Sequence, residues 1–206
     1  MNMNKVYQEA NIPLTMRFLD WIASLLAIEG LTRSNKPLRL RSLISLGLLF
    51  APGVGFVVAL YLLKDSSPRF GWVNNLSVYP WQFWAIALFG MIATLGGAGD
   101  WLFHKVYVTV GTNEHHSHIL ALGAGGLVFV LMAAASLIAN SLDMLIPVIV
   151  ALIVTVVLIC YDEFAFHVRR CKPFETLLHR MLTLGNGAAF LCWMHWVFVA
   201  GVQHAA

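Results

Sequence analysis

Long apolar runs alternate with short polar segments along most of the chain. A helix needs about 20 predominantly apolar residues to cross the ~30 Å hydrocarbon core of a bilayer. Several runs reach this length, and they predict an all-α integral membrane protein that forms one membrane domain over residues 1–206. The predicted transmembrane helices are 42–63, 79–107, 114–139, 143–168 and 174–202.

Two further features predict where the chain meets the membrane interface. Residues 13–32 are apolar at helical spacing, but Arg17, Asp20 and Glu29 interrupt them, as in a helix that lies on the membrane surface. A sixth membrane span is the alternative for this segment. Tryptophans near the far ends of the spans fit an aromatic belt. They are Trp81, Trp84, Trp193 and Trp196.

The composition excludes an ordinary soluble domain. Hydrophobic residues make up 59% of the chain and charged residues 11%, and a soluble fold of this size needs a larger polar shell. The lipid bilayer is therefore the expected surrounding. The net charge of +3 comes from lysines and arginines beside the spans, and it gives no case for a nucleic-acid partner.

The distribution of basic residues predicts the orientation. They gather before the first span and in the turn after the fourth, where Arg169, Arg170 and Lys172 lie, and Lys105 precedes the turn at 107–114. With five spans, these segments all fall on one side of the membrane. The positive-inside rule then places the N-terminus in the cytoplasm and the C-terminus outside, in the inner (cytoplasmic) membrane.

Carboxylates and histidines gather where four of the predicted helices end or begin. Each pair has i,i+4 spacing, which places both side chains on one face of a helix. The pairs are Asp100 with His104, Glu114 with His118, Glu163 with His167, and Glu175 with His179. The predicted topology brings all of them to the cytoplasmic face, because each turn joins one pair to the next.

The two clusters resemble an internal repeat. Each has one pair at the end of a helix and a second pair at the start of the next. The segment LGAG at 122–125 recurs as LGNG at 184–187. This pattern predicts that the last four helices form a bundle made of two repeated helix pairs.

The chemistry of these residues indicates a metal site. Ionisable groups at membrane depth are costly unless they are paired, hydrated or bound to metal. Soluble four-helix bundles hold dinuclear iron or manganese with inward Glu and His side chains. We therefore expect two metal ions bound by the eight paired residues, with iron favoured and zinc, manganese or copper as alternatives. A hydrated polar cluster that closes the mouth of the bundle is the non-functional alternative.

Three more residues belong to this hypothesis. His115 and Asp162 are additional candidate ligands, since each neighbours a predicted ligand in sequence or lies within one helical turn of it. Asp162 is alternatively a second-shell partner for a histidine N–H. Asn186 lies about 10 Å along the helix from His179 by helical rise, which makes it either a substrate-side polar group or an interhelical hydrogen-bonding residue.

The stretch Asp100-x3-His104-x13-His118 resembles the copper-binding stretch of the C subunit of particulate methane and ammonia monooxygenases. The resemblance covers about 20 residues, and it implies that an Asp and two His from adjacent helices hold a copper ion in the membrane. It also implies a second, divergent copy in Glu163, His167 and His179. The extra carboxylates Glu114 and Glu175 depart from the pattern.

These features favour an oxidoreductase, namely an O2-dependent hydroxylase, desaturase or oxygenase that acts on a lipid or another apolar substrate. An external electron donor is expected, because the chain has no flavin or iron–sulfur motif. One alternative is a zinc-dependent membrane hydrolase, in which a metal-bound water attacks an ester or amide. Another is a non-catalytic metal-binding subunit of a membrane complex, and homo-oligomerisation is also left open.

Overall fold

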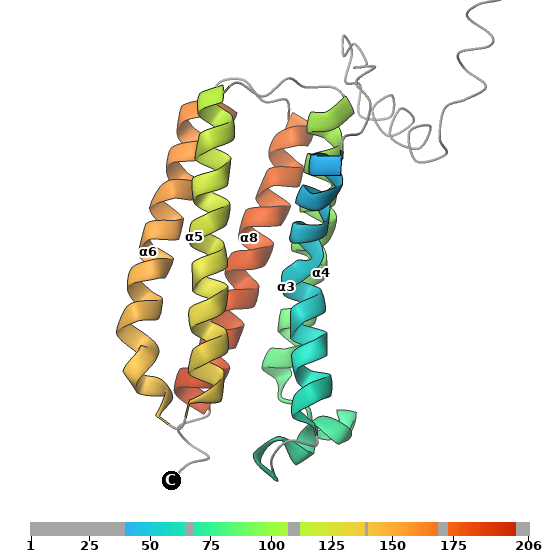
Figure 1. Ribbon diagram of the computed structural model, residues 1–206, viewed down its shortest axis with the longest axis vertical. Coiled ribbons are helices and arrows are strands. Elements are labelled where there is room, and N and C mark those ends of the chain that lie inside the picture. Colours follow the sequence, from blue (N-terminus) through green and yellow to red (C-terminus); the bar gives the residue numbers. More distant parts are fainter. Residues whose placement is uncertain (1–39, 65–67, 107–111, 139, 169–172, 201–206) are drawn as a thin grey trace, which may run out of the picture. The chain divides into compact units, whose positions relative to one another are not determined.

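The computed structural model describes residues 40–64, 68–106, 112–138, 140–168 and 173–200 (Figure 1). Within these ranges the chain is almost entirely helical and contains no strand. The predicted surface helix at 13–32 lies outside the described residues, as do the basic residues of the turn after the fourth predicted span, Arg169, Arg170 and Lys172.

Long helices make up most of this part of the chain: α3 Leu40–Leu63, α4 Trp81–Val106, α5 Thr112–Leu137, α6 Leu145–Asp162 and α8 Pro173–His195. Shorter turns join or extend them: η1 Pro68–Asn74, η2 Leu76–Val78, η3 Ser141–Met144, and the π-helical turns η4 Glu163–His167 and η5 Trp196–Ala200. Proline fixes two of the helix starts, because its constrained φ suits a first turn. Pro173 is the first residue of α8, and Pro80 directly precedes α4.

The described helices are those of a membrane protein. Four segments are long and apolar enough to cross a bilayer, namely Trp81–His104, His116–Leu137, Ser141–Phe166 and Pro173–Ala200. In α3 the apolar segment is shorter, Leu46–Leu62. Many large apolar side chains on the outer faces are exposed, including Leu95 and Val130, at 60% and 61%. Lipid is a suitable surrounding for such faces, whereas water is not.

The most extensive interhelical contacts join α4 to α8 and α5 to α6. The α4–α8 contact is close enough to need glycine. A Cβ added to Gly96 would lie 2.7 Å from the Leu178 carbonyl oxygen, and one added to Gly185 would lie 2.9 Å from the Phe89 carbonyl oxygen. Small residues allow helix backbones to touch in this way, which is the usual packing mode in membranes.

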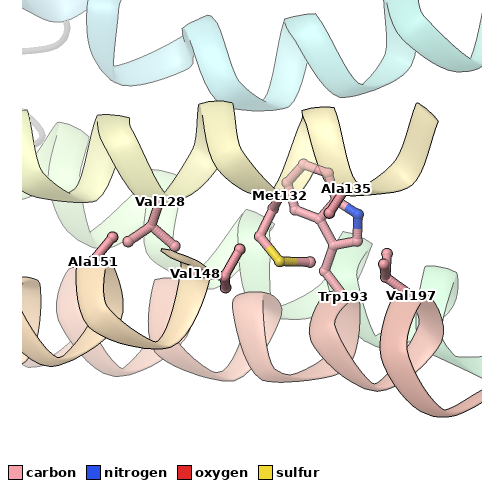
Figure 2. Close-up of a cluster of buried hydrophobic side chains, with 7 residues drawn as sticks. All are labelled: Val128, Met132, Ala135, Val148, Ala151, Trp193 and Val197. Atoms are coloured by element: carbon pink, nitrogen blue, oxygen red, sulfur yellow. The ribbon is translucent and has the colours of Figure 1, made fainter. Parts of the chain in front are cut away.

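A buried apolar cluster in the half of the helices away from His104, His118 and His179 links α8 to α5 and α6. Its members from α5 and α6 are Val128, Met132, Ala135, Val148 and Ala151, and Figure 2 shows Trp193 beside Met132 and Ala135. The Trp193 indole N–H also donates a hydrogen bond to the Ser136 hydroxyl, at 2.9 Å. The prediction of an aromatic belt is wrong for Trp193, because it is buried while Trp81 and Trp84 are exposed.

Candidate functional site

Three imidazole rings from three helices lie together where α4 and α6 end and α5 and α8 begin. His118 of α5 lies between His104 of α4 and His179 of α8. Its ring centroid is 5.9 Å from that of His104 and 6.4 Å from that of His179, with interplanar angles of 28° and 27°. The rings are therefore nearly parallel, and they form the centre of the site.

Each imidazole contacts a carboxylate from a different helix. His104 Nε2 lies 2.7 Å from Glu175 Oε1 of α8, a hydrogen-bonding distance. His118 Nε2 lies 3.0 Å from Asp162 Oδ2 of α6. His179 Nε2 is farther from its neighbour, at 3.9 Å from Glu163 Oε2 of η4. These contacts join the ends of the four helices through polar groups.

The i,i+4 spacing that the sequence displays also produces a contact in α4. Asp100 Oδ2 lies 3.6 Å from His104 Nδ1. His104 therefore has a carboxylate beside each of its ring nitrogens, one from its own helix and one from Glu175 of α8. A histidine held on both sides has a fixed ring orientation, whereas a metal-bound histidine uses only one of its nitrogens for such a contact and the other for the ion.

The carboxylates of the site are withdrawn from the surface. The side chains of Asp162 and Glu175 are 2% and 3% exposed, and that of Asp100 is 11% exposed. Glu163 is the outermost at 17%, and its Oε1 lies 3.5 Å from Nη2 of Arg180, whose side chain is 59% exposed. Glu163 is thus the carboxylate that meets the guanidinium at the rim, while Asp162 and Glu175 meet imidazoles inside.

The π-helical turn η4 begins directly after Asp162 and changes the local register. Asp162 reaches His118 on α5, whereas the next residue, Glu163, lies near His179 on α8. Successive residues of a helix point in different directions, and here two consecutive carboxylates contact histidines of two different helices. Rare π-helical turns occur frequently at functional sites, since they re-aim side chains.

Close packing of α4 on α8 positions the first of these contacts. A Cβ added to Gly99, beside Asp100, would lie 2.8 Å from Leu178 Cδ2, beside His179. The Phe103 and Phe174 rings meet edge to face, with centroids 6.0 Å apart, and Phe103 is 2% exposed. Small and aromatic residues therefore hold the two helix ends at the separation that the His104–Glu175 contact requires.

Seven of the residues that the sequence singled out are brought together. They are Asp100, His104, His118, Asp162, Glu163, Glu175 and His179. The side chains of Glu114, His115 and His167 lie outside the described part of the structure, although their backbones belong to α5 and η4. Asn186 is exposed on α8, whereas His179 on the same helix is buried.

The histidines and carboxylates of the site are arranged mainly in pairs. Among the described residues, no group of three or more His, Cys, Asp or Glu side chains has an arrangement that could hold a metal ion. The nearest contacts run from one imidazole to one carboxylate, and the described donors do not converge on a common point. The metal site that the sequence predicts therefore stays a prediction.

Two features of the site were missed at the level of sequence. The i,i+4 pattern predicts contacts within a helix, but most of the short contacts cross between helices. Arg180 was not a candidate, although it directly follows His179 in the sequence. An arginine beside a buried histidine, on a helix that opens with Glu175, is the signal that could have pointed to it.

No known protein family, curated protein or solved structure matches the chain, so its functional interpretation depends on the geometry of this cluster.

Proposed function

We propose that the protein is a membrane metalloprotein whose histidine–carboxylate cluster binds a dinuclear metal centre, with iron as the favoured metal. We further propose that it is an oxidoreductase that uses O2 on a lipid or another apolar substrate. The observation that carries the proposal is the gathering of three imidazoles and four carboxylates, all buried or partly buried, at four helix ends.

The cluster contains groups that a metal ion can bind. Asp162 and Glu175 each lie beside an imidazole, and Glu163 lies beside both His179 and Arg180. Ionisable groups at membrane depth are costly unless they are paired, hydrated or bound to metal. We propose that metal ions bind among these carboxylates and imidazoles.

The donor set fits the proposed metals. Imidazole nitrogen with carboxylate oxygen suits iron, manganese and zinc, and in four-helix bundles this combination holds dinuclear centres. Because the short contacts are pairwise and the described donors do not converge on one point, a metal ion would bind only after these side chains changed rotamer.

The residues of the cluster would have the following roles. The imidazoles and the buried carboxylates would hold the metal, and iron, when bound, would supply the reactivity with O2. Asp162 and Glu175 are almost fully withdrawn from the surface, with side chains 2% and 3% exposed. An apolar substrate would approach through the lipid, and an external donor would deliver electrons from the cytoplasmic side, because the chain carries no redox cofactor motif.

The proposed topology places the cluster at the cytoplasmic face of the inner membrane. α3 is a fifth span in this proposal, since its 24 residues measure about 36 Å at 1.5 Å per residue. Its exposed residues are large and apolar, such as Leu48, Val57 and Leu62. The N-terminus would then lie in the cytoplasm and the C-terminus outside, as the basic residues of the sequence indicate.

The proposed repeat consists of α4 with α5 and of α6 with α8. Exchange of the two halves maps the α4–α8 contact onto the α6–α5 contact, and these are the two most extensive helix contacts. The helices of one half would therefore pack on those of the other.

Metal analysis tests the proposal. The detergent-purified protein is prepared from cells supplied with iron, zinc, manganese and copper, alongside the His104→Ala and His118→Ala variants. We expect about two irons per chain, as in other dinuclear bundles, and loss of most of the metal in both variants. A Gln82→Leu variant at the opposite helix end, where Gln82 contacts His195 at 2.9 Å, is the matched control and should keep its metal.

Other results would redirect the assignment. Two zinc ions per chain would favour the hydrolase, in which the metal activates a water molecule. One copper ion, lost in His104→Ala, would favour the subunit type that the monooxygenase resemblance implies. No metal in any preparation would refute the proposed function and leave a polar cluster that closes the helix ends.

A further inference from the structure

Helices α5 and α8 touch each other at two separate depths. Near the histidine–carboxylate cluster, the ring centroids of His118 and His179 lie 6.4 Å apart. Farther along the same helices, the rings of Phe129 and Trp193 meet edge to face, with centroids 5.4 Å apart. The distance along the helix from the first contact to the second is about 16 Å on α5 and about 21 Å on α8, at 1.5 Å per residue.

Between these two contacts the facing surfaces of the helices are uncovered. Residues seven positions apart lie on one face of a helix, so Asn186 shares the face of His179 and Trp193, which are both buried. Asn186 is nevertheless exposed. On α5, Leu122 lies one turn after His118 on the face that meets α8, and it is 64% exposed. We call this uncovered stretch at Leu122 and Asn186 the α5–α8 opening.

Asn186 is the polar group of the α5–α8 opening. It lies in the middle of the candidate membrane span Pro173–Ala200, and its side-chain amide forms no hydrogen bond with any of the described residues. Such a group is costly at this depth, because lipid chains offer no hydrogen-bond partner. The α5 side is apolar and roomy, since Leu122 is followed one turn later by Gly126, where a Cβ would meet nothing within 4 Å.

We propose that the α5–α8 opening binds one apolar chain from the bilayer, and that Asn186 forms a hydrogen bond with a hydroxyl group within that chain. A hydroxyl matches an amide, because each group can both donate and accept. A lipid chain can enter sideways between two helices. A second copy of the protein fits less well, because the buried ends of the same face, at His179 and Trp193, keep another helix from lying along it. The inference goes beyond the proposed metal function and does not depend on it.

Photolabelling tests the chemistry of the ligand. The full-length protein in phosphatidylcholine nanodiscs is irradiated with a long-chain secondary alcohol that carries a diazirine, or with the same chain without the hydroxyl, and the labelled peptides are identified by mass spectrometry. The alcohol should label α5 and α8 between their two contacts. Asn186→Leu keeps a side chain of similar size but removes the amide, so the alcohol should label it about threefold to tenfold more weakly, with no change for the other probe.

A pair of tryptophan variants tests the place of binding. Leu122→Trp puts a larger side chain into the α5–α8 opening and should abolish labelling by the alcohol. Leu120→Trp is the matched control, because Leu120 is 59% exposed and lies on nearly the opposite face of α5. Its replacement should leave labelling within about twofold of the unmodified protein, since two positions along a helix turn the side chain away.

The contrary outcomes are distinct from those of the metal analysis. Equal labelling by the two probes, in the unmodified protein and in Asn186→Leu, would mean that ordinary lipid fills the opening and would overturn the inference. So would equal effects of the two tryptophan variants. A dimer of the unmodified protein that Asn186→Leu dissociates, measured by light scattering, would assign the amide to a second copy and overturn it as well. Absence of metal would refute the proposed function but would leave this binding site as it stands.

Discussion

The two extensive helix contacts, α4 with α8 and α5 with α6, use glycine in opposite ways. In α4–α8, a Cβ at Gly96 or Gly185 would collide with the backbone of the neighbouring helix. In α5, a Cβ at Gly123 or Gly126 would meet nothing within 4 Å. The α5–α6 contact instead depends on interlocking apolar side chains such as Val128, Met132 and Val148 (Figure 2). One residue type therefore has a strict role in one contact and none in the other.

The difference has a consequence for the site, which spans both contacts. His104 and Glu175 belong to α4 and α8, whose backbones touch, whereas His118 and Asp162 belong to α5 and α6. Trp193 of α8 packs among the α5 and α6 side chains and joins the two contacts in the other half of the helices. The backbones of α4 and α8 touch, whereas α5 and α6 meet through side chains. His118 and Asp162 therefore have more room to adjust than His104 and Glu175.

The largest effect is expected when the link between the two contacts is removed. Trp193→Ala should lower the free energy of unfolding by about 3–5 kcal/mol, because it empties a buried aromatic position. Thermal unfolding in detergent measures this change. Trp193→Phe keeps most of the packing and loses the hydrogen bond to Ser136, which costs about 0.6 kcal/mol on average in membranes. Similar losses for both variants would contradict a packing role for the indole.

A smaller effect separates the two kinds of glycine. Gly185→Ala should cost about 1–3 kcal/mol, since the new methyl group would meet the backbone of Ala93 and Phe89, which cannot move aside alone. Gly123→Ala is the matched control. It should be neutral or stabilise by up to about 1 kcal/mol through helix propensity. Equal unfolding temperatures for the two variants would disprove the proposed contrast between the helix contacts.

The smallest effect distinguishes a metal site from a structural cluster. Asp162→Asn replaces the carboxylate that lies 3.0 Å from His118 with a neutral amide of the same shape. In the chelator-treated protein it should change the free energy of unfolding by no more than about 1 kcal/mol, or about 2–4 °C in unfolding temperature, because the shape is kept, while the metal content falls. Glu163→Gln should have a smaller effect on stability, because the Glu163 side chain is more exposed, at 17%. Marked destabilisation by Asp162→Asn would favour the structural alternative.

Much of the secondary structure follows from the sequence. The predicted range 79–107 encloses α4, and the range 174–202 covers α8 with its extension η5 except for the first residue, Pro173, since a run of apolar residues of that length admits little except a helix. The all-helical, membrane-type architecture is confirmed in this coarse form. The clustering of carboxylates and histidines at four helix ends could also be predicted from the sequence, because charged residues within apolar runs are rare.

The contacts between side chains of different helices could not be predicted from the sequence in the same way. The i,i+4 rule describes neighbours on one helix, and it led to Glu163 as a main candidate and Asp162 as an additional one. In the structure Asp162 has the shorter contact, at 3.0 Å to His118. A π-helical turn begins directly after Asp162, and no hydrophobic period encodes a turn of that kind.

The sequence by itself therefore determined the helices, their apolar character and the concentration of His, Asp and Glu near their ends, because these depend on local composition and period. Only the tertiary structure decided that His104 faces Glu175, that Arg180 reaches Glu163, and that Trp193 is buried. Those outcomes depend on which helix backbones can approach each other. That approach is set by the glycines of α4 and α8, whose role appears only when their neighbours are in place.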